Sequence, residues 1–428
     1  MPLSRSARCV PCSALLLAVA LAGGLAAACK SKTPAAPTAA PATTITAAPA
    51  STAASAAPAA SAVSAATSAP LPPPPPIAAK SYVLIDVASN QVLAASEDTQ
   101  RVDPASLTKL MTSYVVFHAL REHKLDVDQE VKISEHAWRT GGAASGGSTS
   151  FLDLNSSVKV IDLLQGMIVQ SGNDASIALA EAVAGNEATF AVMMNDYSQR
   201  LGLSGTHWVN SPGLPDPNHY TTARDLGLLS AAIIREFPDY YRWYSQRSFT
   251  YHGIKQDNRN GLLERDPTVD GIKTGHTESA GYCLASSALR NGMRLVAVVM
   301  GTSGFKARED ASATLLGYGF NFFETRKLFA AGQTVGTTPV YKVGEPVTVV
   351  VHNDLYATAP RGQLGNVQAQ LLLTPKLVAP LAASQAIGNV RVVLGGKLLG
   401  ELPAYPQAAV EPGNIWRRVV DGVRLWFA

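Results

Sequence analysis

The sequence predicts an α+β fold, in which a domain of mixed helices and strands precedes a small β-rich domain and a C-terminal amphipathic helix. Apolar residues at helical spacing follow Pro104, and the two apolar runs joined by Asn291-Gly292 are a strong hairpin signal. Residues 335–405 instead contain short apolar stretches interrupted by Gly and Pro. Because 47% of the 428 residues are hydrophobic and 16% are charged, the chain can bury a sizeable core.

The composition excludes several classes of protein. The 35 Lys and Arg residues nearly balance the 32 Asp and Glu residues, whereas a nucleic-acid-binding protein usually carries a clustered basic excess. Four cysteines are too few for a disulfide-rich scaffold, and a single long apolar run argues against a multi-span membrane protein. Cys9 and Cys12 have C-x-x-C spacing, but both lie in the N-terminal targeting segment described next.

Residues 1–28 are predicted to be a signal peptide. Arg5 and Arg8 form a positive region, an apolar run follows at 13–25, and small residues lead to Cys29. The sequence before Cys29 resembles a bacterial lipobox, although Ala26 stands where Leu is usual. Two alternatives stay open, namely lipidation of Cys29 and simple cleavage after Ala28.

Residues 29–79 are predicted to be a disordered linker. Of the 47 residues from 33 to 79, 43 are Ala, Pro, Ser or Thr and none is charged, so the segment cannot bury enough apolar surface to offset the entropy cost of ordering. The run of prolines at 72–76 favours a stiff polyproline II spacer.

The first domain is predicted to span residues 80–330. Strands are expected where apolar and β-branched residues run between turn signals, and helices where apolar residues recur every three or four positions. These patterns predict strands at 81–87, 91–95, 281–289 and 295–300, and helices after Pro104 and at 160–169, 175–184 and 315–328.

Ser106-Leu-Thr-Lys109 is an S-x-x-K sequence at the start of a predicted helix. Residues three apart share one face of a helix, so the Lys109 amine can take the hydroxyl proton of Ser106 as that hydroxyl attacks a carbonyl. The motif alone is weak, because it also occurs at 156–159 and 303–306. The former copy lies in an alternating, strand-like stretch and the latter in a loop flanked by Gly.

Two further motifs follow in a fixed order. Ser171-Gly-Asn173 lies between two predicted helices, and Lys273-Thr-Gly275 occurs once, on the first strand of the later β run. Taken singly, the former is also explained as a helix–helix turn and the latter as an exposed strand end. Together with S-x-x-K, however, S-D-N and K-T-G in this order are the signature of penicillin-binding proteins and class A β-lactamases. Here Gly172 replaces the Asp of S-D-N.

The chain resembles the low-molecular-mass penicillin-binding proteins that are D-alanyl-D-alanine carboxypeptidases. The resemblance rests on residues 104–112, 170–175, 270–277 and 305–309, and His276 after K-T-G is typical of that group. It implies a penicillin-binding/β-lactamase-like transpeptidase domain, in which helices flank an antiparallel sheet. It also implies a serine-type carboxypeptidase that acts on peptidoglycan stem peptides ending in D-Ala-D-Ala and is acylated by β-lactam antibiotics.

The resemblance implies catalytic roles for three residues. Ser106 is the expected nucleophile, Lys109 the expected base, and Ser171 the expected proton carrier to the leaving amine. To act as a base, Lys109 needs a depressed pKa, from burial or from a nearby cation such as Lys273. Substrate binding is assigned to Asn173, Lys273, Thr274, Gly275, His276 and Arg308, with the backbone N–H groups of Ser106 and His276 as the oxyanion hole.

Residues 411–428 are predicted to form an amphipathic membrane-anchor helix, with Pro412 and Gly413 as its hinge. Seven residues share an apolar face: Ile415, Trp416, Val419, Val420, Val423, Trp426 and Phe427. Charged residues fall largely on the other face: Arg417, Arg418, Asp421 and Arg424. This arrangement suits a helix in a membrane interface, and the alternative is a helix docked on the protein's own core. The family resemblance favours the membrane.

No metal or other cofactor is expected, because the eight histidines are scattered and neither an H-E-x-x-H sequence nor a phosphate-binding loop is present. Cys283 is expected to be a core residue. The predicted location is the periplasm or the outer face of the cytoplasmic membrane. A β-lactamase or an endopeptidase of the same fold stays open as an alternative, as does a catalytically silent cell-wall-binding protein.

Overall fold

The computed structural model describes residues 43–45 and 71–427. The domain that carries the three motifs is built on a five-stranded sheet with the order β3-β2-β10-β9-β8, in which all neighbours are antiparallel. Its strands are β2 (Ser81–Asp86), β3 (Val92–Ser96), β8 (Val269–Thr277), β9 (Gly281–Arg290) and β10 (Met293–Thr302). The four strands predicted in this domain are confirmed, and K-T-G lies on β8 as expected.

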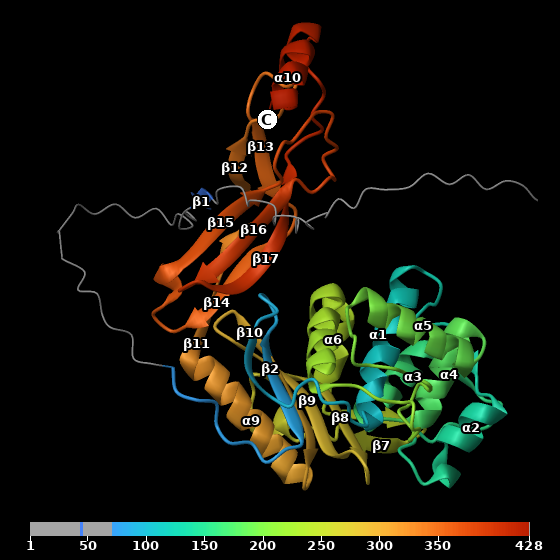
Figure 1. Ribbon diagram of the computed structural model, residues 1–428. Coiled ribbons are helices and arrows are strands. Elements are labelled where there is room, and N and C mark those ends of the chain that lie inside the picture. The colour runs from blue at the N-terminus through green and yellow to red at the C-terminus, as the bar shows by residue number, and fades with distance from the viewer. Residues whose placement is uncertain (1–42, 46–70, 428) are drawn as a thin grey trace, which may run out of the picture. The chain divides into compact units, whose positions relative to one another are not determined.

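Helices cover both faces of this sheet (Figure 1). On β2, Val83 and Ile85 point into one buried cluster, whereas Tyr82 and Leu84 point into a second, as the two-residue period of a strand requires. The first cluster contains residues of α1 (Lys109–Arg121), α4 (Asn173–Ala184) and α6 (Ala223–Glu236), and the second contains residues of α9 (Phe305–Phe322). The predicted antiparallel sheet flanked by helices is therefore confirmed.

The remaining elements of this domain are further helices and two strand pairs. The helices are η1 (Ala105–Thr108), α2 (Glu135–Gly141), η2 (Ala143–Ser145), α3 (Val160–Gln165), the π-helix η3 (Gly166–Gln170), α5 (Glu187–Arg200), α7 (Pro238–Tyr241), η4 (Arg242–Ser245) and α8 (Leu262–Arg265). Two hairpin-like pairs join β4 (Glu130–Lys132) to β5 (Ser157–Lys159) and β6 (Ser248–Tyr251) to β7 (Ile254–Asp257). The predicted helices at 160–169 and 175–184 correspond to α3 with η3 and to α4.

The helix predicted at 315–328 has the wrong bounds. Helix α9 begins ten residues earlier and ends at Phe322, and Phe323–Phe329 forms strand β11, which pairs with β14 (Leu355–Pro360). Leu315 and Leu316 are buried against the sheet, whereas Leu328 and Phe329 are buried in the C-terminal β core. Apolar residues that belong to two different cores therefore happened to follow a single helical spacing in the sequence.

The C-terminal part contains a six-stranded sheet with the order β1-β15-β16-β17-β13-β12. Its strands are β1 (Thr43–Ile45), β12 (Thr334–Thr338), β13 (Val347–Val351), β15 (Val367–Leu373), β16 (Gly388–Leu394) and β17 (Lys397–Pro406), with η5 (Leu364–Asn366) before β15. Gly395 and Gly396 both have positive φ, 56° and 83°, which allows the tight turn between β16 and β17.

The described pieces of the predicted linker contact the folded part. Thr43–Ile45 pairs with β15, and the Tyr318 hydroxyl donates a hydrogen bond of 2.9 Å to the Pro72 carbonyl. Ile77 and Ala79 pack against the core between the sheet and α9. The predicted signal peptide, with Cys9, Cys12 and Cys29, and the rest of the linker lie outside the described residues.

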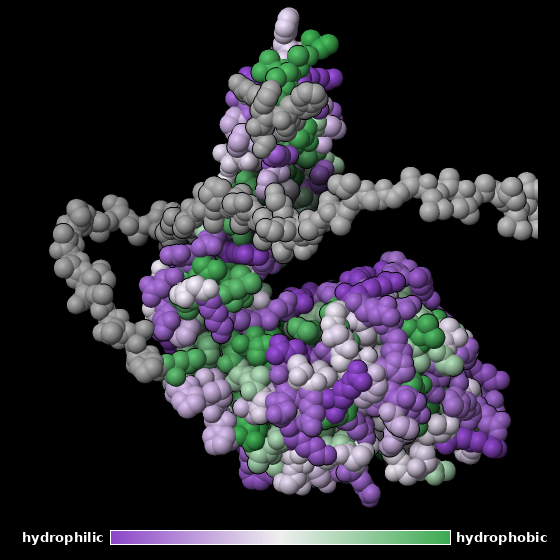
Figure 2. Space-filling view, in the orientation of Figure 1, coloured by the Kyte–Doolittle hydropathy of each residue, from purple (hydrophilic) through white to green (hydrophobic). Residues whose placement is uncertain are grey.

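Helix α10 (Ile415–Phe427) ends the described chain. Figure 2 shows hydrophobic residues gathered on it, and Ile415, Trp416, Val419, Val420 and Val423 are 47–75% exposed. No single helix among residues 43–45 and 71–427 is long and apolar enough to cross a membrane, although the bent pair α4 and α5 passes by length and composition.

Polar contacts hold α10 against a loop of the β-rich part. The Arg417 guanidinium donates to the carbonyls of Val343 and Gly344, and Asp421 accepts from the Lys342 N–H at 2.7 Å. The Gly413 N–H donates to the Lys342 carbonyl at 2.7 Å, so the residue predicted to be a hinge is itself hydrogen-bonded.

Candidate active site

Ser106 lies in η1, one turn before the body of α1. The S-x-x-K spacing places the Lys109 amine next to it, with 3.1 Å between Lys109 Nζ and Ser106 Oγ. Of the three S-x-x-K copies, only this one brings the two side chains together among the described residues. Lys159 instead pairs with Asp128, and Lys306 pairs with Asp310 on the exposed side of α9.

The Lys109 amine is buried and fully hydrogen-bonded. The side chain is 1% exposed, and Nζ also donates to Asn173 Oδ1 at 2.8 Å and to the Pro212 carbonyl at 2.7 Å. Burial and, to a smaller extent, the positive charge of Arg259 lower its pKa to about 7 against the opposing effect of the Asp174 carboxylate. A substantial fraction of Lys109 is therefore neutral at physiological pH.

The cation that lowers the pKa of Lys109 is Arg259 and not Lys273, which the sequence analysis named as a candidate. Burial holds the pKa of Lys273 well below its usual range, and the charges of Lys109, Arg259 and Arg308 add to that effect. Arg259, which the sequence did not single out, lowers the pKa of both.

Ser171 occupies the corner between η3 and α4. The π-helical turn of η3 ends in a left-handed residue, Ser171 with φ 70°, before Asn173 opens α4. The side chain is 2% exposed, and within the described chain its Oγ has no hydrogen-bond partner although it lines the pocket. An unpaired buried hydroxyl is available to a substrate atom.

Strand β8 and helix α9 supply the opposite wall. Thr274, Gly275 and His276 line the pocket from β8, while Lys273 Nζ donates to the Thr274 carbonyl at 3.2 Å. Arg308 is 2% exposed, and its guanidinium donates to the carbonyls of Gly275 (3.4 Å) and Arg259 (3.1 Å). In this way α9 holds a cation directly behind the K-T-G strand.

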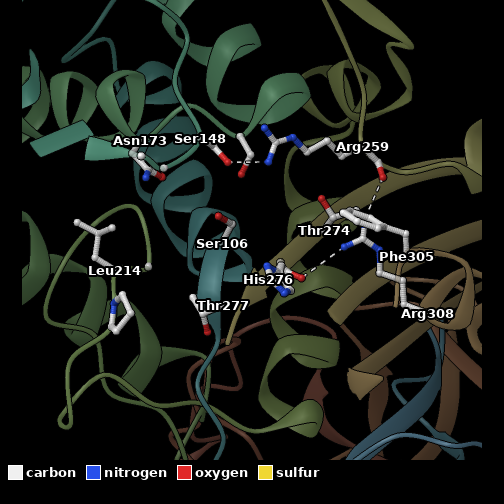
Figure 3. Close-up of a pocket in the computed structure, with 16 residues that line it drawn as sticks. Ser106, Ser148, Asn173, Leu214, Arg259, Thr274, His276, Thr277, Phe305 and Arg308 are labelled. Carbon is white, nitrogen blue, oxygen red and sulfur yellow. Dashed lines mark hydrogen bonds between the residues drawn. The ribbon is translucent and has the colours of Figure 1, made fainter. Parts of the chain in front are cut away.

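These residues surround one pocket of about 340 Å³ (Figure 3). Seven of the nine predicted site residues line it, and Lys109 and Lys273 lie just beneath its surface. The remaining lining residues were not predicted: Gly146, Gly147, Ser148, Gly213, Leu214, Pro215, Arg259, Thr277 and Phe305. None of the lining residues is acidic.

Arg259 is the most consequential of the residues that the sequence did not reveal. Its guanidinium donates to Ser148 Oγ at 2.7 Å, across 111 residues of sequence. The only local signal is its place between Asn258 and Asn260 in a loop, which by itself indicates a turn.

The site holds no group of side chains suited to a metal among the described residues. Cys283 is fully buried, as predicted, and burial raises the pKa of its thiol to about 11, so it does not serve as a thiolate at this site.

Comparison with known proteins gives consistent matches. Residues 66–304 match the family model for D-alanyl-D-alanine carboxypeptidases, and residues 323–412 match that of the penicillin-binding protein 5 C-terminal domain. The chain is 45% identical to D-alanyl-D-alanine carboxypeptidase DacA of Haemophilus influenzae, over 82% of this chain and 89% of that one. It is 41% identical to DacA of Escherichia coli K12, over 82% and 88%.

A solved structure agrees with these relatives. Penicillin-binding protein 5 from Haemophilus influenzae superposes with a TM-score of 0.74 and 44% identity, covering 79% of this chain and 99% of that one. The chain therefore belongs to the D-alanyl-D-alanine carboxypeptidase family of penicillin-binding proteins.

Proposed function

We propose that this serine-type D-Ala-D-Ala carboxypeptidase removes the terminal D-alanine of peptidoglycan stem peptides through an acyl-enzyme on Ser106. The observation that carries the proposal is the buried Lys109 amine, which bridges Ser106 Oγ and Asn173 Oδ1 and has a pKa of about 7. A neutral amine within 3.1 Å of a hydroxyl can take its proton, which makes Ser106 a competent nucleophile.

Acylation then proceeds through a series of proton transfers. Ser106 Oγ attacks the carbonyl carbon of the penultimate D-alanine while its proton moves to Lys109. The negative oxygen that forms is stabilised by the backbone N–H groups of Ser106 and His276, both of which line the pocket. The peptide C–N bond breaks as Ser171 Oγ passes its proton to the leaving amine and takes up the proton held by Lys109. In deacylation, water attacks the ester carbonyl and gives a proton to Lys109, and Ser106 Oγ takes up a proton as the C–O bond to it breaks.

Cations at the far end of the pocket suit the substrate's terminal carboxylate. Thr274 offers a hydroxyl on the pocket wall, Arg259 and Arg308 line the pocket with positive charge, and the Lys273 amine lies behind Thr274. Asn173, whose oxygen holds Lys109, also lines the pocket and can meet the substrate amide with its NH₂ group. Gly275 allows Pro104 and Leu107 to approach β8 closely, since a Cβ there would lie 3.2–3.3 Å from their atoms.

The decisive test is Ser106→Ala. We expect the variant to lose both covalent labelling by a fluorescent penicillin and release of D-alanine from a D-Ala-D-Ala peptide. Ser303→Ala is the matched control, because it removes the serine of another S-x-x-K copy and should leave both activities unchanged. Residual labelling of Ser106→Ala would refute the assignment. Absence of both activities from the wild-type protein would favour the catalytically silent alternative.

The same pocket argues against a β-lactamase. A class A β-lactamase clears its penicilloyl ester with a water activated by a Glu, whereas no carboxylate lines this pocket. Asp216, the carboxylate of the neighbouring loop, is exposed. We therefore predict D-alanine release as the main activity and a long-lived adduct with penicillin. Rapid steady-state hydrolysis of penicillin without D-alanine release, measured by stopped-flow and turnover assays, would contradict this prediction. Cleavage of cross-linked muropeptides would identify the endopeptidase alternative.

An exported location agrees with the family and with the N-terminal sequence pattern. We further propose that α10 anchors the protein at the outer face of the cytoplasmic membrane. The support is its geometry, because the polar side chains Arg417 and Asp421 contact the protein while the apolar side chains stay exposed. Mass spectrometry of the mature N-terminus distinguishes lipidation of Cys29 from cleavage after Ala28.

A further inference from the structure

The residue before the nucleophile has a backbone conformation that L-amino acids rarely adopt. Ala105 is fully buried and has φ 47°, in the left-handed region. Such a residue persists only where its surroundings hold it. Its N–H donates to Asp103 Oδ1, and its carbonyl accepts from the Thr108 hydroxyl, both at 2.8 Å. These two bonds fix the turn that presents Ser106.

The Thr108 hydroxyl has a second partner on a different segment. Its Oγ1 lies 2.8 Å from His219 Nε2, in a fully buried contact 111 residues apart in sequence. A carbonyl only accepts, so the single hydroxyl hydrogen of Thr108 is committed to Ala105. Toward His219 the hydroxyl must therefore accept, which places a hydrogen on Nε2.

The other ring nitrogen of His219 also has a fixed hydrogen-bonding role. The Val209 N–H donates to Nδ1 at 3.1 Å, so Nδ1 must carry a lone pair. Both contacts are satisfied only by a neutral imidazole with its hydrogen on Nε2. A protonated ring would turn an Nδ1–H against the Val209 N–H.

The surroundings keep this imidazole neutral. His219 is 3% exposed, with the Trp208 ring packed edge-on at 5.5 Å, and burial lowers its pKa to about 4. The charged groups around it have smaller and opposing effects: Asp103, Asp216 and Glu187 raise the pKa, and His207 lowers it.

His219 also joins the nucleophile turn to the loop that holds the base. Residues 209–222 supply the Pro212 carbonyl to Lys109 and the Ser211 carbonyl to the Thr112 hydroxyl, at 2.7 and 2.6 Å. The His219–Thr108 contact is a third link between this loop and the η1–α1 segment. Displacing it would therefore move both Ser106 and the carbonyl that orients Lys109.

We propose that His219 is a positioning residue for acylation: acting through Thr108, it holds the Ala105–Ser106 turn in register with Lys109. The inference rests on the proposed role of Ser106 as nucleophile. It assigns His219 no proton-transfer role, because its side chain does not line the Ser106 pocket.

The test compares His219→Leu with His219→Gln in the full chain. Leu removes both ring contacts, whereas the Gln amide can donate to Thr108 and accept from Val209. We expect His219→Leu to lower the rate constant of acylation by a fluorescent penicillin and the kcat for a D-Ala-D-Ala peptide by about tenfold or more, with a smaller change in KM. His219→Gln should recover most of the loss, and Thr108→Val should resemble His219→Leu. The double variant should be little worse than either single one.

His207→Ala is the matched control. His207 lies at the start of the same region and bonds the Asn218 carbonyl, but has no contact with η1 or α1 in the described chain, so acylation should stay near wild type. In parallel, ¹⁵N NMR of the wild-type rings should show His219 with an unprotonated Nδ1 at neutral pH.

Two outcomes with the variants would overturn the proposal, and so would one NMR result. One is unchanged acylation in a folded His219→Leu, and the other is equal impairment of the Leu and Gln variants at equal melting temperature, which would mean that the hydrogen bonds do not matter. An Nδ1 that carries hydrogen would also contradict it, even if no variant folds. Failure of the proposed function itself looks different, because Ser106→Ala would then still be labelled.

Discussion

At Lys109, burial and a neighbouring cation outweigh a neighbouring carboxylate, and the pKa of the amine falls far enough for its proposed role as a base. Burial disfavours the ammonium form, Arg259 disfavours it further, and Asp174 restores part of its stability. Asp174 is itself fixed, because its carboxylate accepts from the N–H groups of Ser150 and Leu152 and from the Thr149 hydroxyl. The charge balance is therefore built into the backbone that shapes the pocket rim.

This balance predicts the pH dependence of acylation. Since the pKa of Lys109 is lowered to about 7, its neutral form grows as pH rises, so the acylation rate constant should increase through about pH 7 and then level off. Arg259→Gln removes a cation, which raises the pKa of Lys109 and should move the inflection to higher pH.

Lys109→Ala should slow acylation by about 10²–10⁴-fold, the usual contribution of general-base catalysis.

Rapid-mixing measurements of acylation by a chromogenic or fluorescent penicillin would check these predictions. A pH range of roughly 5 to 9 brackets the lowered pKa of Lys109, which is about 7. The position of the inflection separates an electrostatic effect of Arg259 from a loss of substrate affinity, which changes only the amplitude or the apparent Kd. An inflection that stays in place in Arg259→Gln would disprove the electrostatic role.

The positions of site residues were predictable from the sequence where they depend on neighbours in the chain or on one regular element. Ser106 and Lys109 meet because one helical turn joins them, and K-T-G lies on a strand whose apolar pattern is readable. Arg259 and Ser148 meet only after the chain has folded, and no spacing rule connects residues 111 positions apart. The same holds for His219 and Thr108.

At the level of elements, the sequence resolved those whose apolar residues all pack in the two clusters on the faces of the five-stranded sheet. Strands β2, β9 and β10 and helices α1 and α4 each contribute to the sheet's own clusters, so their periods stay regular. The error at 315–328 arose where α9 passes into β11 and the apolar side chains change from one core to another. The left-handed Ser171 and the π-helical η3 were also not foreseen, because local strain at a site has no propensity signal.

The loop 209–222 and the nucleophile turn touch at a glycine, which predicts a sharp effect of substitution. Gly213 has φ 86°, and a Cβ there would lie 1.9 Å from the Ala105 carbonyl oxygen and 2.7 Å from Thr108 Oγ1. Gly213→Ala must therefore separate the loop from the turn. Acylation should fall by about tenfold or more, because a displacement near 1 Å can cost that much.

Gly202→Ala is the control for backbone strain alone. Gly202 has φ 72°, but a Cβ there meets nothing within 4 Å, so it should cost only the left-handed conformation, about 1–2 kcal/mol, and leave acylation unchanged. Chemical denaturation and penicillin acylation, measured on both variants, would separate the two effects. Equal acylation rates in the two alanine variants would show that the Gly213 contact does not position the nucleophile.

At the scale of the whole molecule, the geometry of α10 supports its proposed role as the membrane anchor of the catalytic domain. An amphipathic helix normally buries its apolar face on its own protein, yet here Arg417 and Asp421 make the protein contacts, and Trp416 and Val420 remain 75% and 47% exposed. An exposed apolar face with arginines at its border suits the interface of an anionic membrane.

We expect the chain without its first 29 residues, which cannot carry a lipid on Cys29, to bind anionic phospholipid vesicles. Deleting 413–428 should abolish that binding, and replacing Trp416 and Val420 together by Ser should weaken it by about tenfold or more, since burying each such side chain contributes roughly 1.5–3 kcal/mol. Val192→Ser is the matched control, because Val192 is 61% exposed on α5, away from this helix. Vesicle co-sedimentation at two salt concentrations would measure the partitioning, and D-alanine release from a soluble peptide would confirm that the active site is intact. Full binding after the deletion would exclude α10 as the anchor.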